Sequence, residues 1–400
     1  MNLRAALDMM SKPKPKAEPA REEPRFTGCW EKRVIRPLGE FPDTGCIRRE
    51  TVALMQPEAM PGDFDPARIL YLDTETTGLA GGAGTVAFQV GLGRMTAEGF
   101  AITQLVMRDY PEERFLLEKI AEALAESDVI CSVNGKTFDI PLLRDRFLMN
   151  RMRPDALDLP QIDLLHNARR VFRLRLQRCR LADLEEAVLG IPREGDLPGS
   201  EVPERYFRYL KTGDWHLLED VLRHNEQDIA SLCVLLARMC AAYAQPETLT
   251  HGEDLYSMGV GLERQKHPEE ARRCWRLVKD GRMRAASRQE LARSFRRAGD
   301  RSEARDIWLD MIARREGGVQ PYIELAKHYE HAERDPETAL RYTREALMLL
   351  AGPSLFPNQA VQETQNALQY RYARLRQKLA RAERGMTHEH SGDTEGPQGL

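Results

Sequence analysis

The sequence predicts an α/β domain, built on a mixed sheet flanked by helices, followed by an all-α domain of helical repeats. Three short apolar runs, "ILYLD", "VAFQVGLG" and "AITQLVM", precede the first helical stretch, and a fourth run, "DVICSV", follows it. Short apolar runs are typical of strands, so the first three predict a meander and the fourth predicts a crossover to a further strand. From about residue 253 to 350 the apolar spacing becomes helical and repetitive.

A chain of 400 residues exceeds the size at which one hydrophobic core stops growing. The first part is rich in Lys, Pro and Glu with little periodicity, and the last part is polar with several Gly residues, which is typical of flexible segments. We expect a flexible N-terminal extension at 1–66, the α/β domain at 67–245, the helical-repeat domain at 250–384 and a disordered tail at 385–400.

Composition indicates a soluble globular protein. Charged residues make up 30% of the chain and the formal net charge is −3, so a polyanionic partner requires local basic patches. The seven cysteines form no Cys-x-x-Cys pair, which favours small buried residues in a reduced compartment over a zinc site or disulfides. No signal peptide and no run of eighteen apolar residues is evident, so we expect a cytoplasmic protein without membrane contact.

Two acids end the first predicted strand, in "LDTETTGLAGGAG". Pairs of this kind are common on solvated surfaces, but side chains alternate along a strand, so Asp73 and Glu75 project from one face at its carboxyl end. The Gly-rich segment that follows lacks the Gly-Lys-Ser/Thr or Gly-x-Gly-x-x-Gly pattern of nucleotide-binding loops. It predicts a tight turn that lets the backbone approach a substrate.

A third acid, Asp139, follows the fourth predicted strand in "SVNGKTFDIPLL". Alone it is better explained as a helix N-cap or as an acid that stabilises the first turn of a helix. Asn134, in the turn before it, either orients that loop, contacts substrate or serves only the turn.

His224 and Asp228 lie four residues apart in "LLEDVLRHNEQDIASLCVLLARM", and therefore share one face of the predicted helix. They form either an ordinary surface pair or a pair aimed at a common point. Clustered carboxylates repel one another unless cations lie between them, which favours hard divalent ions with oxygen ligands. Two such ions suit an in-line displacement at phosphorus.

The ordered motifs "LDTETTGLAGGAGTVAF", "VNGKTFDIPLLRDRF" and "LEDVLRHNEQDIASL" resemble those of the DEDD exonuclease superfamily on the ribonuclease H-like fold. Within that superfamily the chain is more closely similar to the YprB-type ribonuclease H-like domains. The resemblance covers most of residues 67–240. It implies a metal-dependent nuclease, a 3′–5′ exonuclease acting on DNA or RNA by a two-metal mechanism, with Mg²⁺ or Mn²⁺ as cofactor. The alternative is a catalytically inactive nucleic-acid-binding or scaffold protein that uses its helical repeats.

The same resemblance implies the role of each acid. Asp73 would be shared between two metal ions, Glu75 and Asp228 would complete one metal site, and Asp139 would hold the second ion. His224 would orient or deprotonate the attacking water. His-type members place this His five residues before the last Asp, whereas His224 occupies the position, four before, where Tyr-type members have Tyr.

A basic cluster lies between Leu164 and Leu181 and contains six arginines but no acidic residue. Such a segment suits phosphates, although a solvated helix face explains it equally well, and Phe172 is the one aromatic residue interleaved. The candidate substrate-binding residues are Thr76, Asn134, Arg169, Arg170 and Arg173. Asp163, just before the cluster, is kept outside the core assignment.

The second domain shows a repeat headed by Ala271, Ala304 and Ala339, at spacings of 33 and 35 residues. Its period and the Trp residues of the first two copies, Trp275 and Trp308, resemble tetratricopeptide repeats. Stacked helical hairpins would bury both indoles and leave a concave surface for a protein partner or nucleic acid. Residues 264–315 contain sixteen Lys and Arg residues but only eight Asp and Glu residues, so this surface is expected to be basic.

Overall fold

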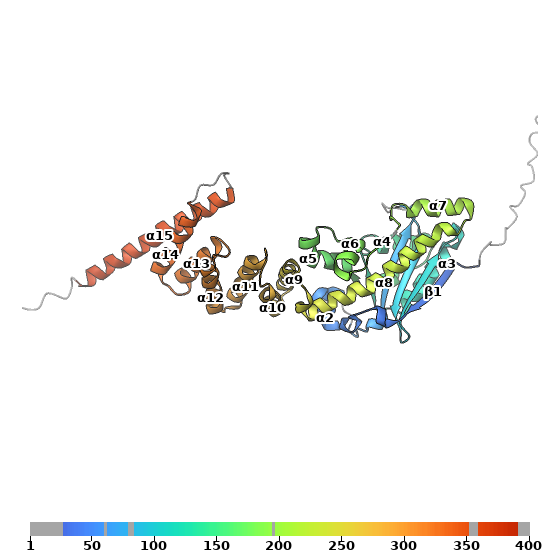
Figure 1. Cartoon of the computed structure of the whole chain (residues 1–400), viewed down its shortest axis with the longest axis horizontal. Helices are drawn as coiled ribbons and strands as arrows, with labels where there is room; N and C mark the ends of the chain where they lie inside the picture. The colour runs from blue at the N-terminus through green and yellow to red at the C-terminus, as the bar shows by residue number, and fades with distance from the viewer. Residues whose placement is uncertain (1–26, 60–61, 79–83, 194–196, 352–358, 391–400) are drawn as a thin grey trace, which may run out of the picture.

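The computed structural model describes residues 27–59, 62–78, 84–193, 197–351 and 359–390, with side chains up to residue 382. Figure 1 shows an elongated molecule, with a sheet-containing unit at one end and a row of helices extending from it to a long C-terminal helix. The first 26 residues, the centre of the Gly-rich turn (79–83) and the final ten residues lie outside the described residues. The expectations for those segments therefore stay predictions.

A six-stranded mixed sheet forms the centre of the N-terminal unit, in the order β1-β4-β3-β2-β5-β6. The strands are β1 (Trp30–Arg36), β2 (Ile69–Thr76), β3 (Ala87–Met95), β4 (Phe100–Val106), β5 (Val129–Ser132) and β6 (Gln161–Asp163). Strands β2, β3 and β4 form an antiparallel meander, while β5 runs parallel to β2 and β6 parallel to β5. The predicted meander and crossover are confirmed.

Helices cover both faces of the sheet because side chains alternate along its strands. The helices of this unit are α2 (Arg49–Met55), α3 (Glu113–Ala125), α4 (Asp139–Met149), α5 (Leu164–Leu176), α6 (Leu181–Leu184), α7 (Val202–Thr212) and α8 (His216–Ala244). Leu70 and Leu72 of β2 pack in one apolar cluster with α3, α4 and α7. Ile69 and Tyr71, which point the other way, pack in a second cluster with α2, α5 and α8.

The expectation of a flexible extension over residues 1–66 is wrong for much of its described part. Strand β1 pairs along β4 from Trp30 opposite Val106 to Arg36 opposite Phe100. Met55 at the end of α2 is fully buried against the same core. The segment has too little periodicity for local sequence to reveal this order, which comes from covering the edge of the sheet.

The C-terminal region is entirely helical where it is described. It contains α9 (Gly252–Arg264), α10 (Pro268–Leu277), α11 (Arg284–Ala298), α12 (Arg301–Ala313), α13 (Gln320–His331), α14 (Pro336–Leu350) and α15 (Gln359–His390). Helices α9 and α10, α11 and α12, and α13 and α14 pack as pairs, with Trp275 and Trp308 buried. The predicted hairpins with buried indoles are confirmed. Helix α15 continues to His390, so it covers the first residues of the segment expected to be a tail.

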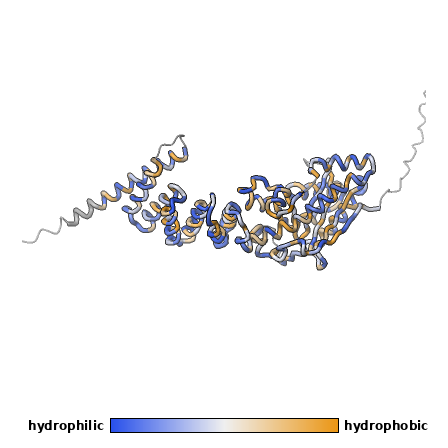
Figure 2. Tube along the Cα trace, in the orientation of Figure 1, coloured by the Kyte–Doolittle hydropathy of each residue, from blue (hydrophilic) through white to orange (hydrophobic). Residues whose placement is uncertain are grey.

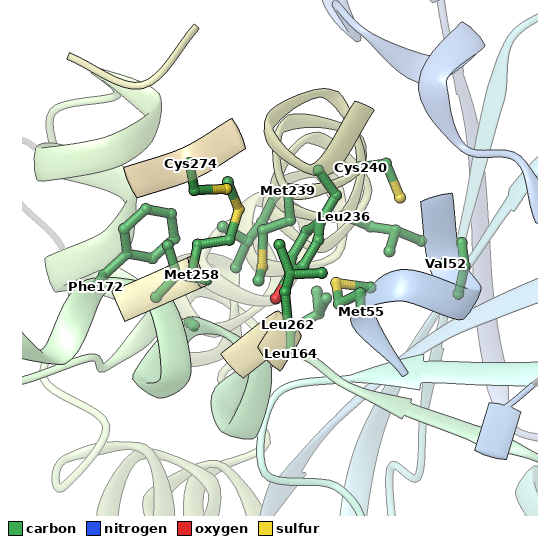
Figure 3. Close-up of a cluster of buried hydrophobic side chains, with 14 of the residues drawn as sticks. Val52, Met55, Leu164, Phe172, Leu236, Met239, Cys240, Met258, Leu262 and Cys274 are labelled. Carbon is green, nitrogen blue, oxygen red and sulfur yellow. The ribbon is translucent and has the colours of Figure 1, made fainter. Parts of the chain in front are cut away.

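The two units share one apolar core. Figure 3 shows Val52, Phe172 and Leu236 of the sheet-containing unit beside Met258 and Leu262 of α9. Figure 2 shows hydrophobic and hydrophilic residues alternating along the paired helices, as amphipathic helices require. The apolar core therefore continues across the boundary near residue 245, and it fixes the first helical repeat relative to the sheet.

Helix α8 has the length and apolar composition of a membrane span, but 83% of its most apolar window is buried inside the protein. This burial is expected for the central helix of a globular core. All seven cysteines are free, and five of them are buried, as predicted for small apolar residues.

Candidate functional site

Four of the predicted site residues lie together where the end of β2 meets α8. The Asn225 amide donates to Asp73 Oδ2 at 3.0 Å. His224 Nε2 lies 3.8 Å from Glu75 Oε1 and 3.6 Å from Asp228 Oδ2. The alternation of β2 and the four-residue spacing of α8 therefore bring Asp73, Glu75, His224 and Asp228 into one cluster.

The close approach of α8 to the sheet depends on Gly91, which is opposite Asp73 on β3. A Cβ atom at Gly91 would lie 2.3 Å from Asn225 Oδ1 and 2.6 Å from Ile229 Cγ1. The Gln104 amide fixes the helix further by donating to the Leu222 carbonyl at 2.6 Å. Glycine at this position is what allows Asn225 to reach Asp73.

Gly91→Ala is expected to lower the free energy of unfolding by about 1–3 kcal/mol, because the added methyl group must displace α8 from the sheet. Urea unfolding checks this, with Gly39→Ala as the matched control, since a Cβ atom at Gly39 meets nothing within 4 Å. Equal midpoints for the two variants would contradict the close-packing argument.

Asp139 reaches the same strand end from the other face of the sheet. It is the first residue of α4, and Thr74 Oγ1 donates to its Oδ1 at 2.5 Å. Thr74 points away from Asp73 and Glu75 because it lies between them on β2. Asp139 thus begins a helix and also lies beside the acidic cluster, so the two interpretations of this residue are compatible.

Asp163 positions the loop before α4. Its carboxylate accepts the backbone N–H groups of Asn134 at 3.0 Å and of Lys136 at 3.3 Å, and it also caps α5 through the N–H of Leu165. Asp163 therefore fixes the turn that precedes Asp139. This is a positioning role, and Asp163 is not one of the four acids expected to bind metal.

Burial disfavours the ionisation of three acids at this site. Burial, followed by the charges of Asp228, Glu75 and Asp139, raises the pKa of Asp73 well above its ordinary value. Burial raises the pKa of Asp139 to about 6, although the hydrogen bond from Thr74 opposes the change. Burial also raises the pKa of Asp228 to about 6, against the opposing effects of His224 and Arg193. Burial is thus the main cause of all three shifts, and at Asp73 the neighbouring carboxylates add to it.

Sequence reasoning missed Arg193 and Glu185. The Arg193 guanidinium donates to Asp228 and to Glu185, and Nη1 lies 3.4 Å from His224 Nδ1. Glu185 is fully buried and also accepts a hydrogen bond from Ser231 of α8. It begins a short π-helix, Glu185–Leu189, a conformation that is frequent at functional sites. The one signal in the sequence was an arginine in the turn-rich segment "IPREGDLPG".

The donor set fits divalent cations by its chemistry. Among the residues that the structure describes, no group of three or more His, Cys, Asp or Glu side chains is arranged to hold a metal ion. However, carboxylate oxygens are the ligands that Mg²⁺ and Mn²⁺ prefer, and the raised pKa values show that added positive charge would stabilise the ionised acids. To bind a cation, Asp228 would have to give up its ion pair with Arg193.

The predicted substrate-binding residues divide into two groups. Thr76 is buried and its hydroxyl donates to the Gly78 carbonyl, while Arg170 donates to the Met55 carbonyl, so both have structural contacts. Asn134, Arg169 and Arg173 line one open pocket of about 730 Å³. Phe172 is buried and so cannot stack on a base.

Comparison with known proteins agrees with this fold. A family model of the RNase H superfamily matches residues 70–240, so the sheet-containing unit is a ribonuclease H-like domain. YprB of Bacillus subtilis (strain 168) is 30% identical over 293 residues, covering 71% of this chain and 70% of that protein. The chain belongs to the family of YprB.

Among solved structures, the family B DNA polymerase of the archaeon Pyrobaculum calidifontis matches 52% of this chain and 30% of the polymerase chain. The sequence identity is 16% and the TM-score is 0.35, a likeness too distant to bear on function.

Proposed function

We propose that this protein is a metal-dependent nuclease that hydrolyses phosphodiester bonds of DNA or RNA, as a DEDD-type 3′–5′ exonuclease with two Mg²⁺ or Mn²⁺ ions. The observation that carries the proposal is the meeting of Asp73, Glu75, Asp228 and His224 between β2 and α8. Membership of the RNase H superfamily supports it, since the nucleases of that superfamily generally use divalent metal ions.

Each residue then has a role. Asp73, Glu75, Asp139 and Asp228 would hold the cations, which supply charge for the phosphodiester in the transition state and lower the pKa of a bound water. Asn225 orients the Asp73 carboxylate by its hydrogen bond. His224 lies within 4 Å of two of the acids, where its imidazole can hold or accept a proton from water.

One observation favours the alternative of an inactive nucleic-acid-binding or scaffold protein. Arg193 neutralises Asp228 directly, as a bound cation would. In that case the helical repeats, which we propose to be tetratricopeptide-like, would provide the main binding surface for a protein partner. We propose a cytoplasmic location in either case.

The deciding experiment incubates purified protein with end-labelled single-stranded DNA and RNA, in the presence of Mn²⁺, Mg²⁺ or EDTA. The nuclease proposal expects mononucleotides to be released from the 3′ end with either metal and none with EDTA. No release from either substrate with either metal would leave the scaffold as the better proposal.

Metal binding should depend on pH, because Asp139 and Asp228 have pKa values of about 6 in the metal-free fold, above their ordinary value of 3.8. Because these pKa values are raised, the folded protein binds protons at the two acids more tightly than the unfolded chain does. This proton binding adds to the free energy of unfolding below pH 3.8, and the added stability is lost as pH rises through 6. A cation requires the ionised acids, so protons compete with it below pH 6.

We therefore expect Mn²⁺ to raise the melting temperature more at pH 7.5 than at pH 5. The apparent affinity should fall about tenfold per carboxylate over that range, since each acid is then mainly protonated. Thermal melts with MnCl₂ and with EDTA at both pH values measure the effect. The same increase at pH 5 and 7.5 would show that these acids do not bind the ion.

A further inference from the structure

An arginine-lined groove runs along the exposed face of α5, outside the acidic cluster. Two open pockets, of about 730 and 840 Å³, share Arg169 and Arg173 as lining residues. These two arginines lie one helical turn apart, about 6 Å along the axis, on one face of α5. Arg178 and Arg180 line the first pocket and Arg264 of α9 lines the second. We call these five residues and the two pockets the arginine groove.

The arginines of the groove differ from those of the repeats. In the repeats, Arg273 pairs with Glu247, Arg284 with Glu316 and Arg297 with Glu263, and further pairs of this kind neutralise much of the expected basic surface. By contrast, within the described part of the chain, no acidic side chain forms an ion pair with Arg169, Arg173 or Arg178.

The described residues that line the two pockets also include no Asp or Glu. Exposed arginines without an acid in the lining of the same pocket are suited to a polyanion.

The groove begins beside the candidate catalytic acids. Asn134 forms part of the wall of the first pocket, and a Cβ atom on the next residue, Gly135, would lie 3.4 Å from Asp139 Oδ2. The backbone of this turn thus separates the arginines from the Asp139 carboxylate. A chain with phosphates in the groove would have one end close to the acids.

The far end of the groove is built by the helical repeats. Arg175 of α5 pairs with the buried Asp254 of α9 at 2.8 Å. Gly261 allows α9 to lie against Arg170, since a Cβ atom there would be 2.8 Å from Arg170 Cδ. Tyr256 of α9 lines the second pocket, where a partly exposed aromatic ring can stack on a base. The shared core of Figure 3 holds both walls in place.

We propose that the arginine groove binds the phosphates of a single nucleic-acid strand and leads that strand from the first helical repeat to the acids around Asp73. Arg169 and Arg173 contact neighbouring phosphates, while Arg178 and Arg180 continue the path toward Asn134. The destination of the strand rests on the proposed function, but binding in the groove does not, so the two can be tested separately.

The test measures binding of fluorescently labelled single-stranded DNA and RNA oligonucleotides to the full chain by anisotropy, in EDTA, which prevents metal-dependent cleavage. Arg169→Gln/Arg173→Gln is compared with Arg114→Gln/Arg153→Gln, which removes the same charge from exposed sites on α3 and in the loop after α4. We expect the groove variant to bind about tenfold more weakly. Its slope of log affinity against log salt should fall by about 1.4, since each phosphate that is no longer neutralised lowers the slope by about 0.7. Unchanged melting temperatures establish that both variants are folded.

Several results would overturn the proposal: equal binding by the two double variants, no binding by the wild type, or equal arginine-dependent binding of polyglutamate, which would indicate an acidic protein partner. Loss of binding in the groove variant of a protein that shows no nuclease activity would support the groove and reject the proposed function. Full nuclease activity together with unaltered binding in the groove variant would support the proposed function and reject the groove.

Discussion

Asp73→Asn is expected to abolish metal-dependent nuclease activity while leaving the protein folded. Asn keeps the shape of the side chain but removes the charge that two cations would share. Loss of correctly placed cations removes several kcal/mol of transition-state stabilisation, so the rate should fall by at least about a hundredfold. The metal-free protein should melt at the same or a higher temperature, because the substitution removes one of the charges that repel within the cluster.

The measurement is release of labelled nucleotides by wild type and variant, purified in parallel, in Mn²⁺ and in EDTA. Asp145→Asn is the matched control, since Asp145 is an exposed acid on α4 and its substitution changes the net charge equally. Asp145→Asn should retain the wild-type rate. If Asp73→Asn also retained that rate, the activity would belong to another site or to a contaminant.

The meander of three strands and the crossover to a fourth could be predicted because local pattern and tertiary structure agree there. Residues 69–76 are apolar on both faces up to Asp73, as a strand between two helical layers must be. The N-terminal segment was not predictable in this way. Strand β1 is polar and mostly exposed, and it is ordered by hydrogen bonds to β4 that no local pattern encodes.

The candidate site also contains some contacts that the sequence predicts and others that it does not. Two-residue spacing on β2 and four-residue spacing on α8 place Asp73 with Glu75 and His224 with Asp228, and both spacings are visible in the sequence. Asn225 could have been noticed beside His224, but its contact with Asp73 depends on Gly91 of another strand. Such contacts arise from packing between elements and leave no periodic signal.

The contacts of Arg193 show why a turn-rich segment can matter to a buried site. Its side chain is 13% exposed, and its guanidinium pairs with both Glu185 and Asp228. Glu185 has no exposed side-chain area, and its carboxylate contacts Arg193 and the hydroxyl of Ser231. Removing one partner of a buried ion pair leaves an uncompensated charge, which costs far more than the net contribution of the pair.

Arg193→Met is therefore expected to lower the free energy of unfolding of the metal-free protein by about 3–5 kcal/mol, measured by urea unfolding. Adding Glu185→Gln should recover much of that loss, because the double variant no longer buries an unpaired carboxylate. Arg114→Met is the control, since Arg114 is 62% exposed and pairs with Glu118 on the surface of α3, where the expected change is within about 1 kcal/mol. Equal midpoints for Arg193→Met and Arg114→Met would mean that Arg193 is not the counter-ion of Glu185. If Glu185→Gln gave no recovery in the Arg193→Met background, the instability would instead come from the loss of a different contact of Arg193, such as that with Asp228.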